Sequence, residues 1–175
     1  MSHADLLFEL GTEDLPPKSL MTLSKALELS VTMQLKELGL AHTEVTSYAT
    51  PRRLTVIVEC LQLQQSDRQE RRRGPSVKAP SNAIDGFARS CNVSPNELIV
   101  IDTEKGQYYE FDRSIKGLKT LDLMSNLIQK ALADLPIAKR MRWGASRDEF
   151  VRPVQWFILS LGGDLVDIEL FGLPN

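Results

Sequence analysis

The stretch DLLFELGTEDLPP (Asp5–Pro17) indicates how the chain begins to fold, and the remaining elements are predicted outward from it. Its first part, Asp5–Gly11, alternates imperfectly and is rich in Leu and Phe, as expected of a strand with one buried face. Gly11 ends the strand. Pro16 and Pro17 then keep the chain extended, because each proline fixes its own φ and disfavours the helical region for the residue before it.

A long amphipathic helix is predicted directly after the two prolines. Apolar residues recur there at intervals of three and four, namely Leu20, Leu23, Leu27, Val31, Leu35 and Leu38. Gly39 suits the position just past a helix end, and Leu40 is placed to close a Schellman-type contact. The chain therefore predicts a strand, a turn and a helix in its first forty residues.

Two more strands are expected next, at Glu44–Tyr48 and Leu54–Cys60, the second being rich in β-branched residues. The tight link between them places Arg52 and Arg53 at a strand mouth. The following segment, Gln64–Pro80, has almost no apolar residues and is expected to be an exposed linker or loop. The elements expected beyond it are a helix capped by Ser81, a turn opened by a capping box at Ser94–Glu97, a hairpin of Leu98–Asp102 with Gln107–Arg113, a helix at Thr120–Leu132, and a hairpin of Val151–Leu161 with Leu165–Leu170.

These elements predict an α+β fold, because hairpins imply mixed or antiparallel sheets and the amphipathic helices must pack on them. We expect two small subdomains. The first covers residues 1–65 and the second covers residues 81–175, with a basic linker or loop at residues 66–80 between them.

Charge is distributed unevenly along the 175 residues, whose formal net charge is −2 and whose hydrophobic content of 42% is enough for a real core. Residues 1–50 hold seven acidic side chains and three lysines, whereas Ser66–Lys78 and Pro136–Pro153 each hold five cations and two acids. Two basic segments in an otherwise acidic chain suit a protein that touches a polyanion at chosen points. The alternative is that each segment is a solvated charged face.

Several classes of site are not expected. Cys60 and Cys91 follow no metal-ligand spacing, and His3 and His42 lie in polar segments, so we expect neither a metal site nor a catalytic histidine. The segment KGLKT at residues 116–120 lacks the pattern of a phosphate-binding loop. Two acids in the first ten residues argue against a signal peptide or a membrane helix. We expect a cytoplasmic chain with no bound cofactor.

The turn that carries Arg52 and Arg53 is a candidate phosphate clamp, because guanidinium groups bind phosphate through two parallel hydrogen bonds. Glu9, Glu13 and Asp14 form the tightest carboxylate group. Acid–base use would require them to line a pocket. The alternative is that Glu13 and Asp14 favour the positive end of the following helix.

A second candidate lies in the segment KRMRWG, where Arg140 and Arg142 flank Trp143. This segment combines phosphate contacts with a stacking surface for an unpaired base or a terminal adenosine. The alternative is that Trp143 belongs to the core and that the arginines pair with Asp148 and Glu149.

Six motifs in this order resemble the amino-terminal part of the β subunit of the heterotetrameric bacterial glycyl-tRNA synthetases. They are LLFELGTEDLPP, ATPRRLTV, RRRGP, DGFAR at Asp85–Arg89, MRWG at Met141–Gly144 and FVRPVQW at Phe150–Trp156. Together they cover nearly the whole chain. The chain differs from the family in two ways. The stretch Ser76–Ile84 is shorter than in the family, and the whole chain is several times shorter, so the resemblance implies an amino-terminal fragment.

The resemblance implies a class II aminoacyl-tRNA synthetase in which the α subunit binds glycine and ATP with Mg, while the β subunit binds tRNA. Its expected partners are therefore the α subunit and tRNA(Gly), with no membrane and no DNA. This portion is expected to carry no catalytic residue and to bind tRNA, dock the α subunit, or both. The alternative is a structural scaffold without tRNA contact. The candidate tRNA-binding residues are Arg52, Arg53, Arg71, Arg72, Arg73, Arg140, Arg142, Trp143 and Arg152.

Overall fold

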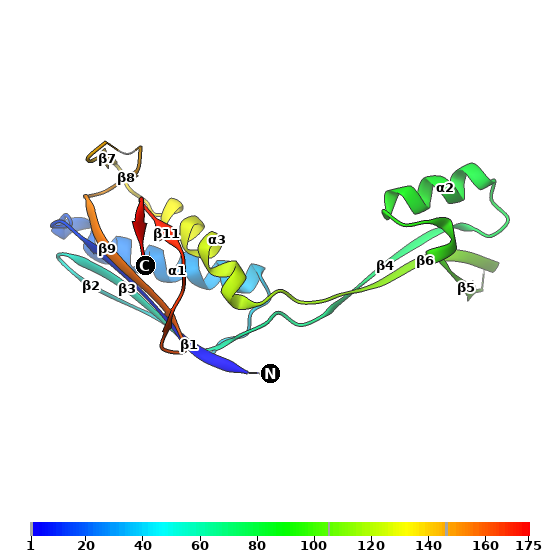
Figure 1. Ribbon diagram of the computed structural model, residues 1–175, viewed down its shortest axis with the longest axis horizontal. Helices are drawn as coiled ribbons and strands as arrows, with labels where there is room; N and C mark the ends of the chain where they lie inside the picture. Colours follow the sequence, from blue (N-terminus) through cyan, green and yellow to red (C-terminus); the bar gives the residue numbers. More distant parts are fainter. Residues whose placement is uncertain (1, 105, 146) are drawn as a thin grey trace. The chain divides into compact units, whose positions relative to one another are not determined.

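A computed structural model describes residues 2–104, 106–145 and 147–175. The chain divides into two compact units, which are described separately. Unit 1 is built from Met1–Gln65 and Leu118–Asn175, and unit 2 from Ser66–Gly117 (Figure 1). Unit 2 is therefore an insertion in the chain of unit 1.

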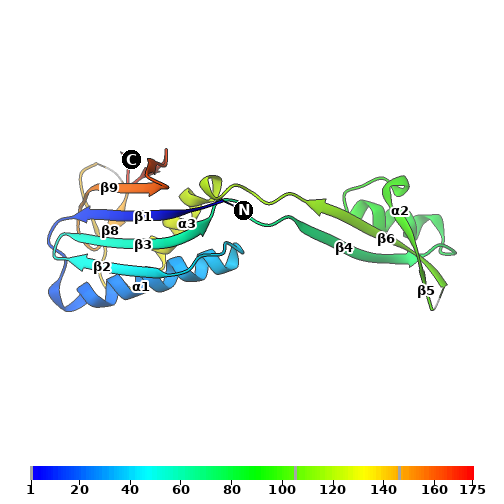
Figure 2. The same ribbon diagram turned by 90° about the horizontal axis from the view of Figure 1, so that it is seen from below.

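Unit 1 is built on a five-stranded antiparallel sheet with the order β10-β9-β1-β3-β2. Its elements are β1 (His3–Thr12), α1 (Pro17–Glu37), β2 (Val45–Thr50), β3 (Arg53–Gln62), α3 (Thr120–Ala133), β9 (Val154–Leu161) and β10 (Asp164–Leu165). Figure 2 shows β9, β1, β3 and β2 side by side. Without β10, the chain order β1-α1-β2-β3-α3-β9 and this strand order are those of a ferredoxin-like fold. Two short pairs complete the unit, β7 (Met141–Arg142) with β8 (Glu149–Phe150), and β11 (Glu169–Leu170) with β12 (Leu173–Pro174).

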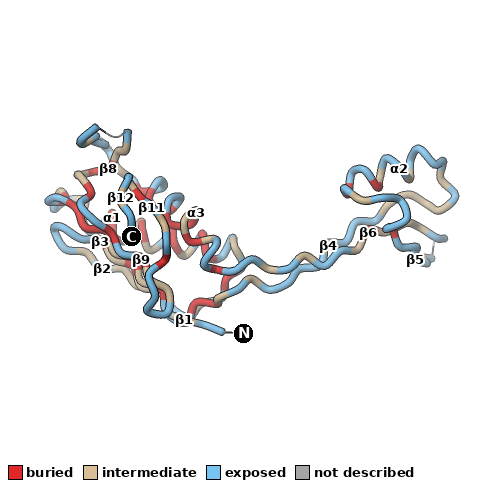
Figure 3. The backbone as a smooth tube through the Cα atoms, viewed as in Figure 1, coloured by how far each residue is buried: buried red, intermediate tan, exposed pale blue. Residues whose placement is uncertain are grey.

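The core of unit 1 lies between one face of this sheet and its helices, where buried positions gather in Figure 3. Alternate residues of β1 and β3 are buried, as the two-residue period of a strand requires. Helix α1 contributes residues three or four positions apart, and α3 packs beside it. These buried side chains are Leu6, Phe8, Leu10, Leu54, Val56, Val58, Leu23, Leu27, Val31 and Leu35.

The end of α1 is confirmed as a Schellman motif. Gly39 has a φ of 65°, and its amide donates to the Lys36 carbonyl at 3.0 Å. The Leu40 amide donates to the Leu35 carbonyl, also at 3.0 Å, and the Leu40 side chain is buried. This closure turns the chain from the helix toward β2.

Unit 2 is a three-stranded antiparallel sheet, ordered β4-β6-β5, packed against one helix. Its elements are β4 (Arg68–Ser76), α2 (Ser81–Ser90), a 3₁₀ turn (Pro95–Glu97), β5 (Ile99–Thr103) and β6 (Gly106–Ile115). The capping box is present, since Ser94 and Glu97 bond reciprocally. Ser81 lies inside α2 and makes no capping bond, because Pro80 occupies the N-cap position. Lys105, in the predicted β5–β6 turn, lies outside the described residues.

The α+β class is confirmed, and one element prediction is wrong. The expected linker at residues 66–80 contains strand β4, which pairs with β6 from Arg68 to Ser76. A polar edge strand is held by backbone hydrogen bonds, so its side chains gave no apolar signal. The units also differ from the expected subdomains, since residues 118–175 belong with residues 1–65. The physical reason is that β9 pairs with β1 and α3 packs on α1.

Two smaller expectations need correction as well. The apolar spacing of Leu121, Met124, Ile128 and Leu132 predicts that Leu121 faces the core, but on α3 it is 50% exposed. The last predicted run, Leu165–Leu170, forms only the short strands β10 and β11. In the part of the chain that the structure describes, no helix is long and apolar enough to cross a membrane.

Candidate functional site

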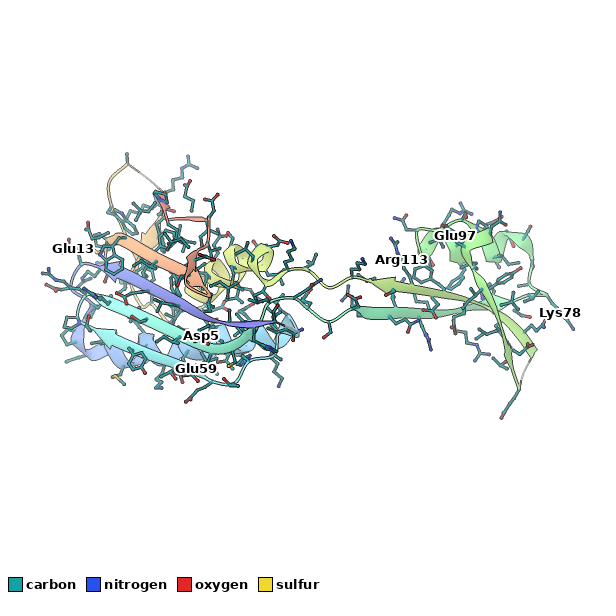
Figure 4. All side chains as sticks on the ribbon, turned by 60° about the horizontal axis from the view of Figure 1, so that its bottom comes forward. Asp5, Glu13, Glu59, Lys78, Glu97 and Arg113 are labelled. Carbon is teal, nitrogen blue, oxygen red and sulfur yellow. The ribbon has the colours of Figure 1, made fainter. Side chains whose placement is uncertain are left out.

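Three segments that are far apart in sequence meet at the end of the unit 1 sheet where β1 finishes. The Thr12 amide donates to the Arg52 carbonyl at 2.9 Å, and the Leu15 amide donates to the Pro51 carbonyl at 2.7 Å. The Glu13 amide donates to the carbonyl of the proline at position 153 at 3.0 Å. We call this region, formed by residues 12–15, 51–53 and 152–156, the loop end of the sheet. Figure 4 labels Glu13 there, and Asp5 and Glu59 farther along the sheet.

Asp14 is the centre of one charged group at the loop end. Arg52 Nε donates to Asp14 Oδ1 at 2.8 Å, and Arg152 Nε donates to the Asp14 carbonyl at 3.0 Å. The hydrogen bond from Arg52 and its positive charge lower the pKa of the Asp14 carboxyl, and the charge of Arg152 adds to this. Asp14 in turn raises the pKa of Arg52. Both side chains of the Arg52–Asp14 pair are about two-thirds exposed, so the pair adds little to stability and water competes for it.

Arg53 belongs to a second group on the adjoining strands. Its Nη1 lies 3.2 Å from Glu9 Oε1, and Thr55 Oγ1 donates to Glu9 Oε2 at 3.2 Å. The guanidinium carbon of Arg53 also lies 5.5 Å from the centroid of the Trp156 ring. This distance is within the range of a cation–π contact. Gly11 lies between Arg53 and Trp156, since it is the register partner of both.

The loop end therefore carries arginines and carboxylates in similar numbers. Arg52 pairs with the Asp14 carboxylate, Arg152 donates to the Asp14 carbonyl, and Arg53 pairs with Glu9 of the adjoining β1. Gln155 Nε2 donates to Glu13 Oε1 at 3.0 Å. This arrangement holds guanidinium groups in place while leaving their outer edges in solvent. Phosphate oxygens offer the same bidentate acceptor geometry as a carboxylate and suit these positions.

Arg140, Arg142 and Trp143 lie around the β7–β8 pair. Arg142 Nε lies 2.6 Å from Glu149 Oε1, and Arg140 Nη2 donates to the Ala133 carbonyl at the end of α3 at 3.0 Å. The Trp143 ring is half-buried against the core, with its centroid 5.8 Å from that of a phenylalanine ring at position 171. Trp143 thus packs against the core and Arg142 pairs with Glu149, as in the alternative interpretation of this segment.

Arg71, Arg72 and Arg73 lie in unit 2, on β4. Neighbours on a strand point to opposite faces, so these arginines do not form one patch. Arg71 Nε lies 3.1 Å from Asp112 Oδ2, and Arg72 Nη2 lies 2.7 Å from a carboxylate oxygen at position 70. The guanidinium carbon of Arg73 lies 4.1 Å from the centroid of the Tyr108 ring.

The structure thus brings together Arg52, Arg53 and Arg152 in unit 1, whereas the arginines of β4 belong to unit 2. It also adds Trp156 and Gly11, which sequence reasoning did not select. Trp156 directly precedes Phe157 in an apolar strand, and neighbouring residues of a strand point to opposite faces. Because Phe157 is buried, Trp156 lies on the other face of β9. Among the described residues, no group of three His, Cys, Asp or Glu side chains is arranged to hold a metal ion.

Comparisons with known proteins agree over the whole chain. Residues 6–175 match the family described as glycyl-tRNA synthetase beta subunit. A glycine–tRNA ligase beta subunit of Hahella chejuensis is 42% identical over 180 residues, which cover 99% of this chain and 26% of that protein. Its counterpart in Coxiella burnetii (strain RSA 493) is 46% identical over 98% of this chain, and that of Klebsiella pneumoniae is 40% identical over all of it. The chain spans about a quarter of the length of these relatives, at 26% of each.

Proposed function

Because this chain belongs to the glycyl-tRNA synthetase β-subunit family, we propose that it serves glycine–tRNA ligase activity by binding tRNA(Gly), by docking the α subunit, or by both. In this proposal the ligase is a cytoplasmic class II heterotetramer, and glycine and ATP with Mg bind to the α subunit. The present chain contributes no catalytic residue. It contacts neither membrane nor DNA.

The observation that carries tRNA binding is the convergence of Arg52, Arg53 and Arg152 at the loop end. They come from three separate segments that backbone hydrogen bonds hold together. The side chains of Arg52 and Arg53 are 67% and 58% exposed in spite of their ion pairs. Breaking an exposed ion pair costs little free energy, so a phosphate of the RNA can replace the carboxylate as the partner of the arginine.

The other candidate tRNA-binding arginines have less support than those of the loop end. Arg140 and Arg142 lie on unit 1, whereas Arg71, Arg72 and Arg73 lie on unit 2, so the two sets are tested separately. Each set has an ion-pair, carbonyl or ring contact that holds its side chains in a defined orientation.

The test replaces the three loop-end arginines in the assembled synthetase, as the variant Arg52→Ala/Arg53→Ala/Arg152→Ala. Its affinity for tRNA(Gly) is measured at several salt concentrations. Each lost phosphate contact is expected to reduce the slope of log K against log salt by roughly 0.7–0.9. The matched control is Lys25→Ala/Lys36→Ala/Lys130→Ala, which removes the same charge from α1 and α3 and is expected to leave tRNA affinity nearly unchanged.

The structural alternative predicts a different outcome. If the loop end serves only folding or assembly, the arginine variant shows a lower Tm or a smaller fraction of assembled α and β chains by sedimentation. It then keeps normal tRNA affinity and salt slope for each assembled enzyme. That result would refute tRNA contact at the loop end.

A further inference from the structure

Among the described residues of unit 1, no helix covers the face of the sheet opposite α1 and α3, which carries large side chains. We call it the open face. Its exposed apolar members lie on β2, β9 and β10, whereas the apolar residues of this face on β1 and β3 are half-buried. The exposed apolar residues there are Tyr48, Trp156, Ile158 and Leu165, at 57%, 37%, 39% and 64% exposure.

Trp156 is held on the open face by the absence of a side chain at Gly11. A Cβ atom built on Gly11 would lie 2.2 Å from Trp156 Cε2 and 2.5 Å from Nε1. The indole therefore rests on the backbone of β1, where any other residue would displace it. One side of the ring packs on the sheet, yet the side chain keeps more than a third of its surface in solvent.

Arg53 lies on the other side of Gly11 from Trp156 and contacts the same indole ring. Its guanidinium carbon lies 5.5 Å from the Trp156 centroid, and its Nη1 donates to Glu9, whose other carboxylate oxygen accepts from Thr55. The Arg53 guanidinium thus lies over an aromatic ring that keeps 37% of its surface in solvent, on an exposed antiparallel sheet. Bases of unpaired RNA stack on both kinds of surface, and their phosphates bind guanidinium groups.

We propose that Trp156 and Arg53 bind an unpaired nucleotide of tRNA, with the base stacked on the indole and its phosphate held by Arg53. This inference rests on the proposed tRNA-binding function and names the subsite. The pairing of an exposed aromatic ring with a guanidinium favours RNA as the occupant, because a base stacks on the first and a phosphate binds the second, and Arg52 and Arg152 lie at the same end of the sheet. The apolar neighbours Ile158 and Leu165 make a protein partner the competing occupant.

The test uses the assembled synthetase with tRNA(Gly) as the probe. Trp156→Ala is expected to weaken tRNA binding roughly 5- to 150-fold, the range found when one stacking side chain is lost. The salt slope should stay unchanged, because stacking releases no counterions. Trp156→Phe should retain most of the affinity, and Gly11→Ala should weaken binding because it displaces the indole without removing it.

Ile158→Ala is the matched control, since Ile158 lies on the same strand and face but cannot stack a base. It is expected to leave tRNA affinity unchanged. If Trp156→Ala binds tRNA normally while the triple arginine variant does not, the subsite is refuted and tRNA binding stands. If Trp156→Ala and Ile158→Ala both impair assembly with the α chain and keep tRNA affinity per assembled enzyme, the open face binds protein and the inference is overturned.

Discussion

Replacing Gly11 by alanine tests whether the Trp156 ring lies on the backbone of β1. The added Cβ would lie 2.2 Å from the indole, far inside van der Waals contact, so the ring must leave its place. Gly11 is buried in a central strand and has no positive φ, so alanine fits its backbone conformation. The destabilisation therefore comes from the displaced ring alone.

The expected loss is about 1–2.5 kcal/mol. A tryptophan buries about 150–250 Å² when packed, and Trp156 keeps 37% of its surface exposed. Losing roughly 60–80 Å² of that contact costs about 1.5–2 kcal/mol, and losing the Arg53 cation–π contact adds about 0.5–1 kcal/mol. Alanine has less conformational freedom than glycine in the unfolded chain, which offsets this loss by about 0.5–1 kcal/mol.

The assay is a double-mutant cycle by urea unfolding of Gly11→Ala, Trp156→Ala and the double variant. In the Trp156→Ala background no ring opposes the new methyl group, so Gly11→Ala should be neutral or stabilise by up to about 1 kcal/mol. The expected coupling is about 2 kcal/mol. Equal effects of Gly11→Ala in both backgrounds would show that the indole does not rest on Gly11, and the stacking subsite would lose its geometric basis.

Three further predictions concern charge and helix stability. The Asp14 carboxyl should titrate below its usual pKa of 3.8 by ¹³C NMR and return toward it in Arg52→Ala; an unmoved pKa would exclude the pair in solution. Glu28 accepts from the Ser47 amide and hydroxyl, so Glu28→Ala should cost about 1.5–3 kcal/mol at neutral pH by urea unfolding. Lys25 and Ser47 lower the Glu28 pKa, so this cost is present above pH 4.5 and should vanish as pH falls through the folded pKa; a cost that persists in acid would contradict the assignment. Gly86→Ala, with nothing within 4 Å of the new Cβ, should stabilise α2 by up to about 1 kcal/mol in hydrogen exchange; a loss would mean an unseen contact.

Local patterns in the sequence predicted most elements and missed their long-range pairing. The five leucine and valine positions of α1, its C-cap Leu38 and the Gly39–Leu40 closure follow from the 3.6-residue period and the freedom of glycine at positive φ. Strand β4 was missed because Arg68–Ser76 bury no apolar row. The pairing of β1 with β9 joins residues at opposite ends of the chain, and periodicity carries no information about which strands become neighbours.

The candidate site divides in the same way. Arg52 and Arg53 could be predicted at a strand mouth, because Pro51 and the flanking β-branched residues mark the turn. Their approach to Arg152 depends on the β1–β9 pairing. The two tryptophans could not be told apart from composition alone. Only the packing shows that Trp143 leans on the core, whereas Trp156 keeps more than a third of its surface exposed above Gly11.

The position of β1 in its sheet has a consequence for synthesis on the ribosome. This strand is made before the other strands of its sheet, yet one of its two edges is covered only by β9. About 140 residues separate the two strands, which at about 5–20 residues per second leaves that edge unpaired for roughly 7–30 s. About a third of this delay is the translation of unit 2. An unpaired, leucine-rich edge is prone to pair with other nascent chains, so β1 stays open to such pairing until β9 is made.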